Sequence, residues 1–519
     1  MNKNGLIYDV HDRPKFAQML LFALQQVLAI MAATIAVPAI IGLPMQIPAA
    51  LLGAGVGTIV YLLFTRFKSP VFLGSSFAFL GSLGTAVTYG YLGIIAGSVC
   101  AGLVYVVIAI VIRFAGTDWV NKLLPPVVIG PTVAIIGLSL AGNAMGDIVK
   151  ASASSNPAYS SYNLVGLLCG LITFFTVVIC STQKRVKMMK LIPFIIGIGA
   201  GYLAATIFTL IGKVADVDYL MIINFQPLID NFVTADGSFK GFTAILNYPD
   251  FALLEAVKEL KNGTAQIADA KLLDWKGFVE VAIAFTPVAL VVFAEHIADH
   301  KNLSSIIGKD LIKEPGLSRT LLGDGVGSIA GTFMGICPNT TYGESVGCVA
   351  ITKNASIVTI FTAAIMCMAL SFVMPIMSLL QTIPACVMGG VCLTLYGFIA
   401  VSGLKMFKDL DLNENKNLFV VSAILIAGIG GLAIQIPYSA KMATGFAIAF
   451  ENGVPVDIVQ VITGFANVIT VTSIATALIL GIVTNLVLTK VEKSKLGKEK
   501  EESVATAAVP EEQQPQEEV

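Results

Sequence analysis

The sequence has few charged residues for its length. Only 13% of its 519 residues are Asp, Glu, Lys or Arg, whereas 56% are hydrophobic. A soluble domain carries roughly 25% charged residues, so this chain has too little polar surface to coat a water-soluble particle of its size. Burial in a lipid bilayer is the direct interpretation. The formal net charge of -1 gives no whole-protein field that would attract nucleic acid, so we expect no nucleic-acid partner.

The sequence also lacks the residue patterns of metal sites and of common hydrolases. Its three histidines are too few and too scattered for a metal cluster, and its eight cysteines form no CxxC pair. Because every cysteine lies within or beside an apolar stretch, buried small hydrophobes are favoured over disulfides or metal ligands. No GxSxG or HExxH motif is present. We therefore expect no metal, no cofactor and no enzymatic activity.

The N-terminal segment, residues 1–15, is polar and has no apolar core of the kind found in a signal peptide. We therefore expect no cleaved signal peptide. The first apolar span must act as its own insertion signal, which leaves residues 1–15 as a cytoplasmic N-terminus.

Apolar runs of about 17–25 residues indicate membrane-spanning helices. The sequence predicts about fourteen of them, which makes the chain an all-α polytopic membrane protein. The predicted segments lie near residues 16–42, 46–65, 70–87, 91–114, 122–142, 162–181, 191–212, 277–298, 320–337, 339–352, 355–376, 380–403, 417–436 and 456–489. The region 437–489 could hold one span together with a re-entrant or interfacial piece.

The connecting loops alternate in charge. Loops after the even-numbered segments are rich in Lys and Arg, and the short loops on the other side are nearly free of them. Because basic loops stay in the cytoplasm, an even number of spans with both termini inside is expected. The longest loop, 213–275, would face outside. The tail 490–519 ends in the acidic run PEEQQPQEEV and is predicted to be disordered.

Two of the predicted segments are too interrupted to be ordinary spanning helices. Residues 70–80 read PVFLGSSFAFL and residues 337–347 read CPNTTYGESVG. They occupy the third and tenth positions, which correspond if the chain is two seven-span halves, and a repeat with an odd number of spans is inverted. Interrupted segments at matching positions indicate a transporter's binding site. The alternative, kinked packing helices, is weakened because two such segments occur in register.

Acidic residues inside the apolar spans are few. Glu295 and Asp299 are four residues apart in the eighth span and share one helix face; Glu344 lies in the tenth segment. Ionisable groups at membrane depth usually serve a site or a pathway. For Asp299 and the neighbouring histidines, His296 and His300, the alternative is that the span is ending and they meet cytoplasmic water. Asp324, in the ninth span, is expected to cap or cross helices rather than to touch substrate.

This set of groups suits a nucleobase, whose ring edge carries N–H donors beside carbonyl acceptors. Carboxylates at Glu295 and Glu344 could accept from the N–H groups, and backbone N–H groups at Phe77 and Gly343 could donate to the carbonyls. Phe77 or Tyr342 could stack on the ring, although lipid or core packing would explain either aromatic alone. A buried carboxyl group can also take up and release a proton, which would couple transport to a proton gradient.

At these residues the chain resembles the nucleobase–ascorbate transporter family, also called nucleobase:cation symporters, and most closely its bacterial uracil permeases. The matching pieces are LQQVLAIMAATIAVP at 24–38, LGSSFAF at 73–79, AEH at 294–296, KDLIKEPGLSRTLLGDG at 309–325, PNTTYGESVGCVAITK at 338–353 and IPACVMGGVCLTLYGFIAVSG at 383–403. The resemblance is strong over residues 15–405; PNTTYGE with its flanking residues is specific, whereas AEH alone is not.

The resemblance implies two inverted seven-span repeats with a short strand beside a half-helix in the third and tenth spans. It implies an elevator-type, proton-coupled importer that works as a homodimer in the cell membrane. It implies a core domain of spans 1–4 and 8–11 and a gate domain of spans 5–7 and 12–14. The implied parts are core 16–114 and 276–376, gate 115–212 and 377–489, and an outer loop at 213–275.

The same resemblance implies the substrate contacts. It places substrate carboxylates at Glu295 and Glu344, backbone contacts at Phe77 and Gly343, and Tyr342 beside the ring. Ser76 is included among the expected substrate-binding residues, and Asp299 among those that govern proton coupling or selectivity.

Three positions depart from the family pattern. The usual Gln-His pair of the first span is Gln25-Gln26 here, a histidine is replaced by Asp299, and the usual Asn after the second glutamate is Ser345. The TYGE motif favours uracil, whereas Asp299 resembles the xanthine-type branch, so a xanthine or purine substrate stays open. An anion carrier of the same fold would need a cationic site that these segments lack, and sensing by a receptor is the remaining alternative.

Overall fold

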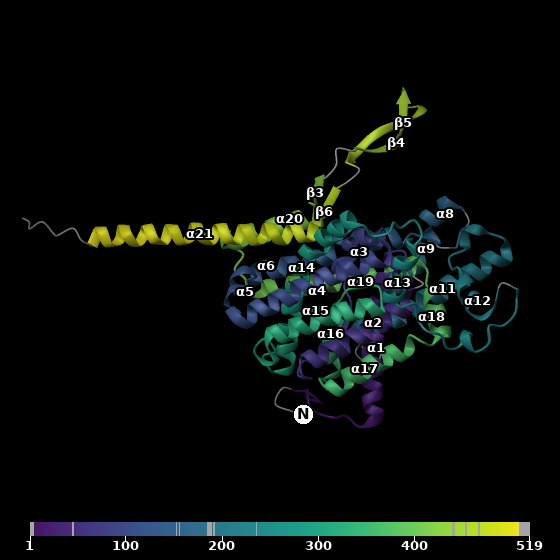
Figure 1. Cartoon of the computed structure of the whole chain (residues 1–519), viewed down its shortest axis with the longest axis horizontal. Coiled ribbons are helices and arrows are strands. Elements are labelled where there is room, and N and C mark those ends of the chain that lie inside the picture. The colour runs from purple at the N-terminus through teal and green to yellow at the C-terminus, as the bar shows by residue number, and fades with distance from the viewer. Residues whose placement is uncertain are drawn as a thin grey trace, which may run out of the picture.

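The structure is a computed structural model that describes residues 5–43, 46–151, 153–154, 156–183, 189, 192–234, 236–437, 442–451, 454–465 and 468–507. Most of these residues are helical, and the helices form one layered body (Figure 1). Within the described residues, nine helices are long and apolar enough to cross a membrane, and three shorter apolar helices accompany them. Both the sequence and the structure therefore indicate an integral membrane protein.

The first half of the chain contains the helices that correspond to the first seven predicted segments, with short helices between some of them. They are α1 (Phe16–Ile40), α2 (Ile47–Phe64), η2 (Phe77–Phe79), α3 (Leu80–Val87), α4 (Gly90–Ala115), α5 (Asp118–Leu123), α6 (Pro126–Ser139), α7 (Ala141–Asp147), α8 (Pro157–Ser161), α9 (Leu164–Thr182) and α11 (Pro193–Ala215).

The second half is laid out in the same way. Its helices are α14 (Trp275–Ile307), η5 (Ile312–Gly316), α15 (Leu317–Met334), α16 (Gly343–Thr352), α17 (Ile357–Leu370), α18 (Met374–Gln381), α19 (Ala385–Lys405), η6 (Met406–Asp409), α20 (Asn415–Ile429) and α21 (Ser473–Ala507). Each of the fourteen predicted segments overlaps one of the helices in these two sets.

The helices pack in two groups. Helices α1, α2, α4, α14, α15 and α17 pack mainly on one another, and α6, α9, α11, α19, α20 and α21 form a second set. Glycines allow the closest approach in the first group: a Cβ added to Gly57 of α2 would lie 2.8 Å from the carbonyl oxygen of Gly327 in α15. Small residues at such crossings let helix backbones touch. The same glycine also lies against the Asn339 side chain, which belongs to one of the interrupted segments.

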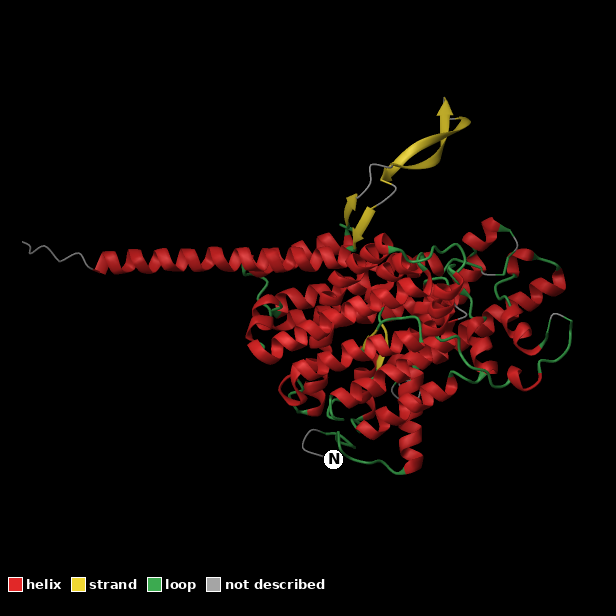
Figure 2. Cartoon of the chain, in the orientation of Figure 1, coloured by secondary structure: helices red, strands yellow, loops and turns green. Residues whose placement is uncertain are grey.

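The interrupted segments are broken as predicted. Two short strands, β1 (Leu73–Ser75) and β2 (Asn339–Thr341), pair antiparallel inside the helical body (Figure 2), with Gly74 opposite Thr340. Each strand is followed by a short helix, η2 and α3 after β1, and α16 after β2. The prediction of a strand beside a half-helix in the third and tenth segments is confirmed.

The outer loop, predicted only as a long connection, contains four short helices among its described residues. They are η3 (Asp218–Leu220), α12 (Gln226–Phe232), η4 (Gly241–Ala244) and α13 (Ala252–Asn262). The fully buried carboxylate of Glu259 in α13 accepts hydrogen bonds from the backbone N–H groups of Tyr91 and Leu92, at 3.0 and 2.9 Å. It thereby caps the N-terminus of α4, where the helix dipole favours negative charge, and fixes the loop on the body.

The end of the chain differs from the helical prediction. Strands β3 (Ile434–Pro437), β4 (Met442–Glu451), β5 (Val454–Phe465) and β6 (Val468–Val471) form two antiparallel pairs, β3–β6 and β4–β5, and the second pair projects away from the helices (Figure 1). The prediction of a helix over 456–472 is therefore wrong. Segment 454–465, VPVDIVQVITGF, is rich in β-branched residues, which favour a strand at equal hydrophobicity.

The last helix starts later and ends later than predicted. Helix α21 begins at Ser473 and continues to Ala507, into the tail that the sequence predicts to be disordered from Lys490. The rest of that tail, residues 508–519, lies outside the described residues.

Candidate functional site

The paired strands are tied to the helices around them. Asn339 Nδ2 donates to the carbonyl oxygen of Gly53 in α2, at 2.9 Å, and the N–H of Leu73 donates to Thr58 Oγ1, also at 2.9 Å. Pro338 disfavours helical backbone at the residue before it, which is why the tenth segment does not continue α15. The result is a rigid piece of non-helical backbone buried in protein, where such backbone is tolerated at membrane depth.

Two helices begin directly after the strands. Phe77 opens η2 and Gly343 opens α16. The first backbone N–H groups of a helix have no acceptor within it and favour a negatively polarised partner. Phe77 and Gly343 therefore each stand at a helix start, and a contact of their N–H groups with a substrate stays a prediction.

Three carboxyl groups gather beside these helix starts. Glu295 and Asp299 lie one turn apart on α14, and the Glu295 carboxyl is close enough to Asp299 and Glu344 to interact with both electrostatically. Asp299 Oδ2 accepts a 2.8 Å hydrogen bond from Thr341 Oγ1 of β2, and a Cβ on Gly343 would lie 3.7 Å from Asp299 Oδ1. The structure thus brings together all three acidic residues that the sequence singled out.

The protein covers these residues only in part. Gly343 is exposed, and Glu295 and Glu344 are partly exposed, although the residues that flank Glu295 and those that flank the Gly343–Glu344 pair are buried. Among the described residues, no other side chain donates a hydrogen bond to the Glu295 or Glu344 carboxylate. The hydroxyl of Ser76 is also buried, with the residue 2% exposed, and finds no partner in the described part of the chain. Buried polar groups normally have partners, so these three are available to a ligand.

The two aromatic residues are placed differently. Phe77 packs edge-on against Tyr396 of α19, with the ring centroids 5.4 Å apart, so it lies where the two helix groups meet. Tyr342 packs against Gly74, which has no side chain to obstruct the ring, and its hydroxyl donates to the carbonyl oxygen of Ser75 at 2.7 Å. Tyr342 thus holds β1, and contact between either ring and a base stays a prediction.

The histidines do not meet water at the end of a span. Helix α14 continues to Ile307, and both His296 and His300 are fully buried and hydrogen-bonded. The alternative that the span ends near Asp299 is therefore wrong, because the helix continues for about two more turns beyond that residue. Asp324 crosses between helices, as expected, by pairing with His296.

Sequence reasoning missed two neighbours of the site. Gln26 is buried in α1 and its Nε2 lies 3.4 Å from the carbonyl oxygen of Ser345, to which it donates. The Ser345 hydroxyl in turn accepts from the N–H of Phe72 at 3.3 Å. Both residues stand at positions where the chain departs from the family pattern, which was the only signal available for them.

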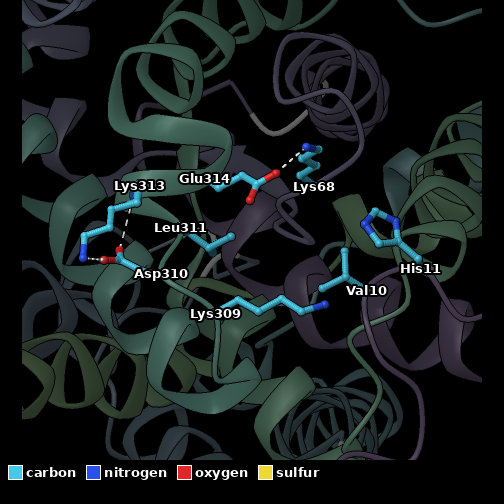
Figure 3. Close-up of a pocket in the computed structure, with 8 residues that line it drawn as sticks. All are labelled: Val10, His11, Lys68, Lys309, Asp310, Leu311, Lys313 and Glu314. Carbon is cyan, nitrogen blue, oxygen red and sulfur yellow. Dashed lines mark hydrogen bonds and ion pairs between the residues drawn. The ribbon is translucent and has the colours of Figure 1, made fainter.

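A surface pocket of about 400 Å³ lies elsewhere, beside the N-terminal segment (Figure 3). It is lined by Val10, His11, Lys68, Lys309, Asp310, Leu311, Lys313 and Glu314. Its lysines are paired: Lys68 with Glu314, which lowers the pKa of that carboxyl, Lys309 with Asp9, and Lys313 with Asp310. Exposed, mutually neutralised groups of this kind are typical of a solvated surface, and none of the expected site residues lies there.

The chain is similar to known permeases along most of its length. The model of the Permease family matches residues 17–437. The uracil permease of Bacillus caldolyticus is 37% identical over 461 residues, which cover 88% of this chain and 95% of that protein. The uracil permease of Escherichia coli (strain K12) is 31% identical over 453 residues, covering 87% of this chain and 93% of that protein.

Solved structures share the fold at low sequence identity. The transmembrane domain of the cyanobacterial bicarbonate transporter BicA aligns with a TM-score of 0.51 at 13% identity, over 81% of this chain and 97% of that one. The murine anion transporter Slc26a9 aligns with a TM-score of 0.56 at 12% identity, over 93% of this chain and 69% of that one. The chain therefore shares the fold of these proteins. From the matched family model and the relatives that align along most of its length, the chain belongs to the Permease family, the xanthine/uracil permeases, and is a transporter rather than an enzyme.

Proposed function

We propose that the chain imports a nucleobase, uracil in the first place, together with a proton. The observation that carries the proposal is the meeting of Glu295 and Glu344, which come from separate segments, beside the helix starts at Phe77 and Gly343. Carboxylates accept from ring N–H groups, and backbone N–H groups donate to ring carbonyls, so one edge of a pyrimidine would satisfy both. The related uracil permeases support the choice of uracil.

The carboxyl cluster also supports proton coupling. Three acids at one place in a membrane protein repel one another when all are ionised, so at least one is expected to hold a proton. The groups that act electrostatically on Glu295 are all carboxyls, namely Asp299, Glu344 and Asp324. A neutral substrate that accompanies a proton fits such a site, whereas an anion of the kind carried by the structural neighbours would be repelled.

The movement we propose is an elevator. The helix group of α1, α2, α4 and α14–α17 would carry the site as a core domain, and the group that contains α6, α9, α11 and α19–α21 would serve as the gate. The overlap of the fourteen predicted segments with helices supports two inverted seven-span repeats. We further propose that the protein works as a homodimer in the cell membrane with both termini in the cytoplasm.

Uptake into proteoliposomes tests this function. Vesicles with purified full-length chain are expected to accumulate labelled uracil when the inside is alkaline, and to lose the accumulation when a protonophore collapses the gradient. Competition by unlabelled xanthine and other bases ranks the possible substrates. This comparison is needed because Asp299 resembles the xanthine-type branch of the family. Failure to take up any nucleobase would contradict the proposed substrate. Equal accumulation of uracil with and without the gradient would contradict proton coupling.

The matched control for the site is on the same helix. Glu280 of α14 has its carboxylate bonded to Tyr89 Oη at 2.6 Å, so Glu280→Gln makes the same chemical change as Glu295→Gln outside the carboxyl cluster. If uptake is retained in Glu280→Gln and lost in Glu295→Gln, the loss is due to the carboxyl cluster rather than to a general change in helix α14.

A further inference from the structure

A second polar cluster lies beside the substrate carboxyls, on the neighbouring face of α14. His296 follows Glu295 directly, and its Nδ1 lies 2.7 Å from Asp324 Oδ2 of α15, with both side chains fully buried. The other ring nitrogen, Nε2, lies 3.0 Å from Thr320 Oγ1. The proposed transport chemistry uses none of these groups directly.

Asp324 also reaches the paired strands. Thr340 Oγ1 donates to the same Asp324 Oδ2 at 3.4 Å, and the backbone of Thr341 lies beside this carboxyl group. Thr340 is the middle residue of β2 and pairs with Gly74 of β1. A single carboxyl group of α15 therefore touches both α14 and β2.

The contacts continue from β2 into the site. Thr341, the next residue, donates its hydroxyl to Asp299 at 2.8 Å, and β2 leads through Tyr342 into Gly343 and Glu344. A shift of β2 relative to α14 would therefore change the distance between the two parts that supply Glu295 and Glu344. Because a buried carboxyl group is costly without its partners, Asp324 holds these parts in one relative position.

We propose that Asp324 is a positioning residue of the transport site, which sets α14 against the β2–α16 segment by bonding His296 and Thr340 at once. Asp324 itself does not touch the substrate. The inference rests on the proposed function, since it concerns how the nucleobase site is held. A displacement of about 1 Å in the groups of a functional site can reduce its rate by about 100-fold.

A matched contact exists that lacks the link to the strands. Tyr61 Oη of α2 lies 2.7 Å from His300 Nε2, one turn further along α14, and both residues are fully buried. Tyr61 also bonds Ser69, at 2.7 Å, and neither bond involves β1 or β2. Tyr61→Phe therefore removes a buried polar contact from α14 without touching the element that carries Gly343 and Glu344.

Binding of labelled uracil to the purified full-length chain tests the proposal, with thermal unfolding of the same samples. We expect Asp324→Asn to weaken binding by about tenfold or more, and Tyr61→Phe to change it by less than about threefold, at a similar loss of Tm. Uracil affinity of Asp324→Asn within threefold of the wild type would overturn the proposal.

Two further variants keep the test decisive if Asp324→Asn does not fold. Thr340→Val removes only the link to β2 and leaves the His296–Asp324 pair, so it should weaken binding while Tm stays close to that of the wild type. Combined with Thr341→Val, its effect should be less than the product of the two single effects, because both act through the same strand. Unchanged binding by Thr340→Val, or strictly multiplicative effects, would contradict the proposal. A wild-type chain that binds no nucleobase would instead remove the proposed function itself.

Discussion

Two adjacent faces of α14 both carry ionisable side chains, but the protein surrounds these side chains differently. On one face, Glu295 keeps solvent access and receives no hydrogen bond from another side chain in the described part of the chain. On the other face, His296 and His300 are fully buried, and both ring nitrogens of each are bonded. All these residues lie within two turns of one helix, so position along the span alone does not identify a site.

Partnering is what separates the two faces. A buried polar group with complete bonds holds helices together, whereas one left without them is either costly or awaits a ligand. By this criterion Glu295, Glu344 and the Ser76 hydroxyl belong to the site, and His296 and His300 belong to its support. Asp324 is bonded only through Oδ2, to His296 and Thr340, and its buried Oδ1 has no partner among the described residues. Asp299 stands between the two sets, because Thr341 bonds one of its oxygens.

The largest effect is expected where the unpartnered carboxyls are neutralised. Glu295→Gln and Glu344→Gln should each reduce uracil uptake about 100-fold or more, since each would lose charge-assisted hydrogen bonds and a group that can exchange a proton. Initial uptake rates in proteoliposomes, normalised to inserted protein, measure this. Glu280→Gln is the control, and transport near the wild-type rate by either site variant would remove that residue from the site.

A smaller, substrate-dependent effect is expected at the intermediate position. Asp299→His should change the ratio of uracil to xanthine affinity about tenfold, because it replaces an acceptor beside Gly343 with a ring that can donate. Competition curves with both bases give the ratio. If both affinities shift by the same factor, Asp299 supports the site without selecting the base.

A modest loss is expected at the buried hydroxyl. Ser76→Ala should weaken uracil binding about three- to tenfold, in line with one hydrogen bond, while Tm stays the same or rises because an unsatisfied buried group is removed. Equilibrium binding and thermal unfolding of the same sample measure both quantities. Unchanged affinity together with a lower Tm would place Ser76 among the supporting residues instead.

The smallest effect on binding is expected at a carboxylate that is fully partnered. Glu259 accepts three backbone hydrogen bonds, from Tyr91, Leu92 and Gln266. Glu259→Gln should destabilise the protein by about 1 kcal/mol through loss of the α4 cap, seen as a lower Tm, with uracil affinity within twofold of the wild type. A large loss of affinity at normal Tm would contradict the partnering criterion.

The parts of the site that could be predicted are those with a local signal. Gly, Pro, Ser and Thr within apolar runs predicted the breaks at 70–80 and 337–347, and the rarity of acids in such runs singled out Glu295 and Glu344. Both signals are visible along the chain, because the bilayer penalises irregular backbone and charge wherever they occur.

The parts that could not be predicted depend on contacts between distant segments. The burial of His300 required knowing that Tyr61, 239 residues earlier, supplies its partner, and the capping by Glu259 joins a loop to a helix 168 residues away. The strands in 434–471 were missed because hydrophobicity alone does not separate an apolar strand from an apolar helix.

A structure of the full-length chain with uracil bound tests the central claim most directly. We expect the base between the carboxyl groups of Glu295 and Glu344, with its carbonyl oxygens toward the N–H groups of Phe77 and Gly343. Density for the base at any place where it contacts neither carboxyl group would contradict this account.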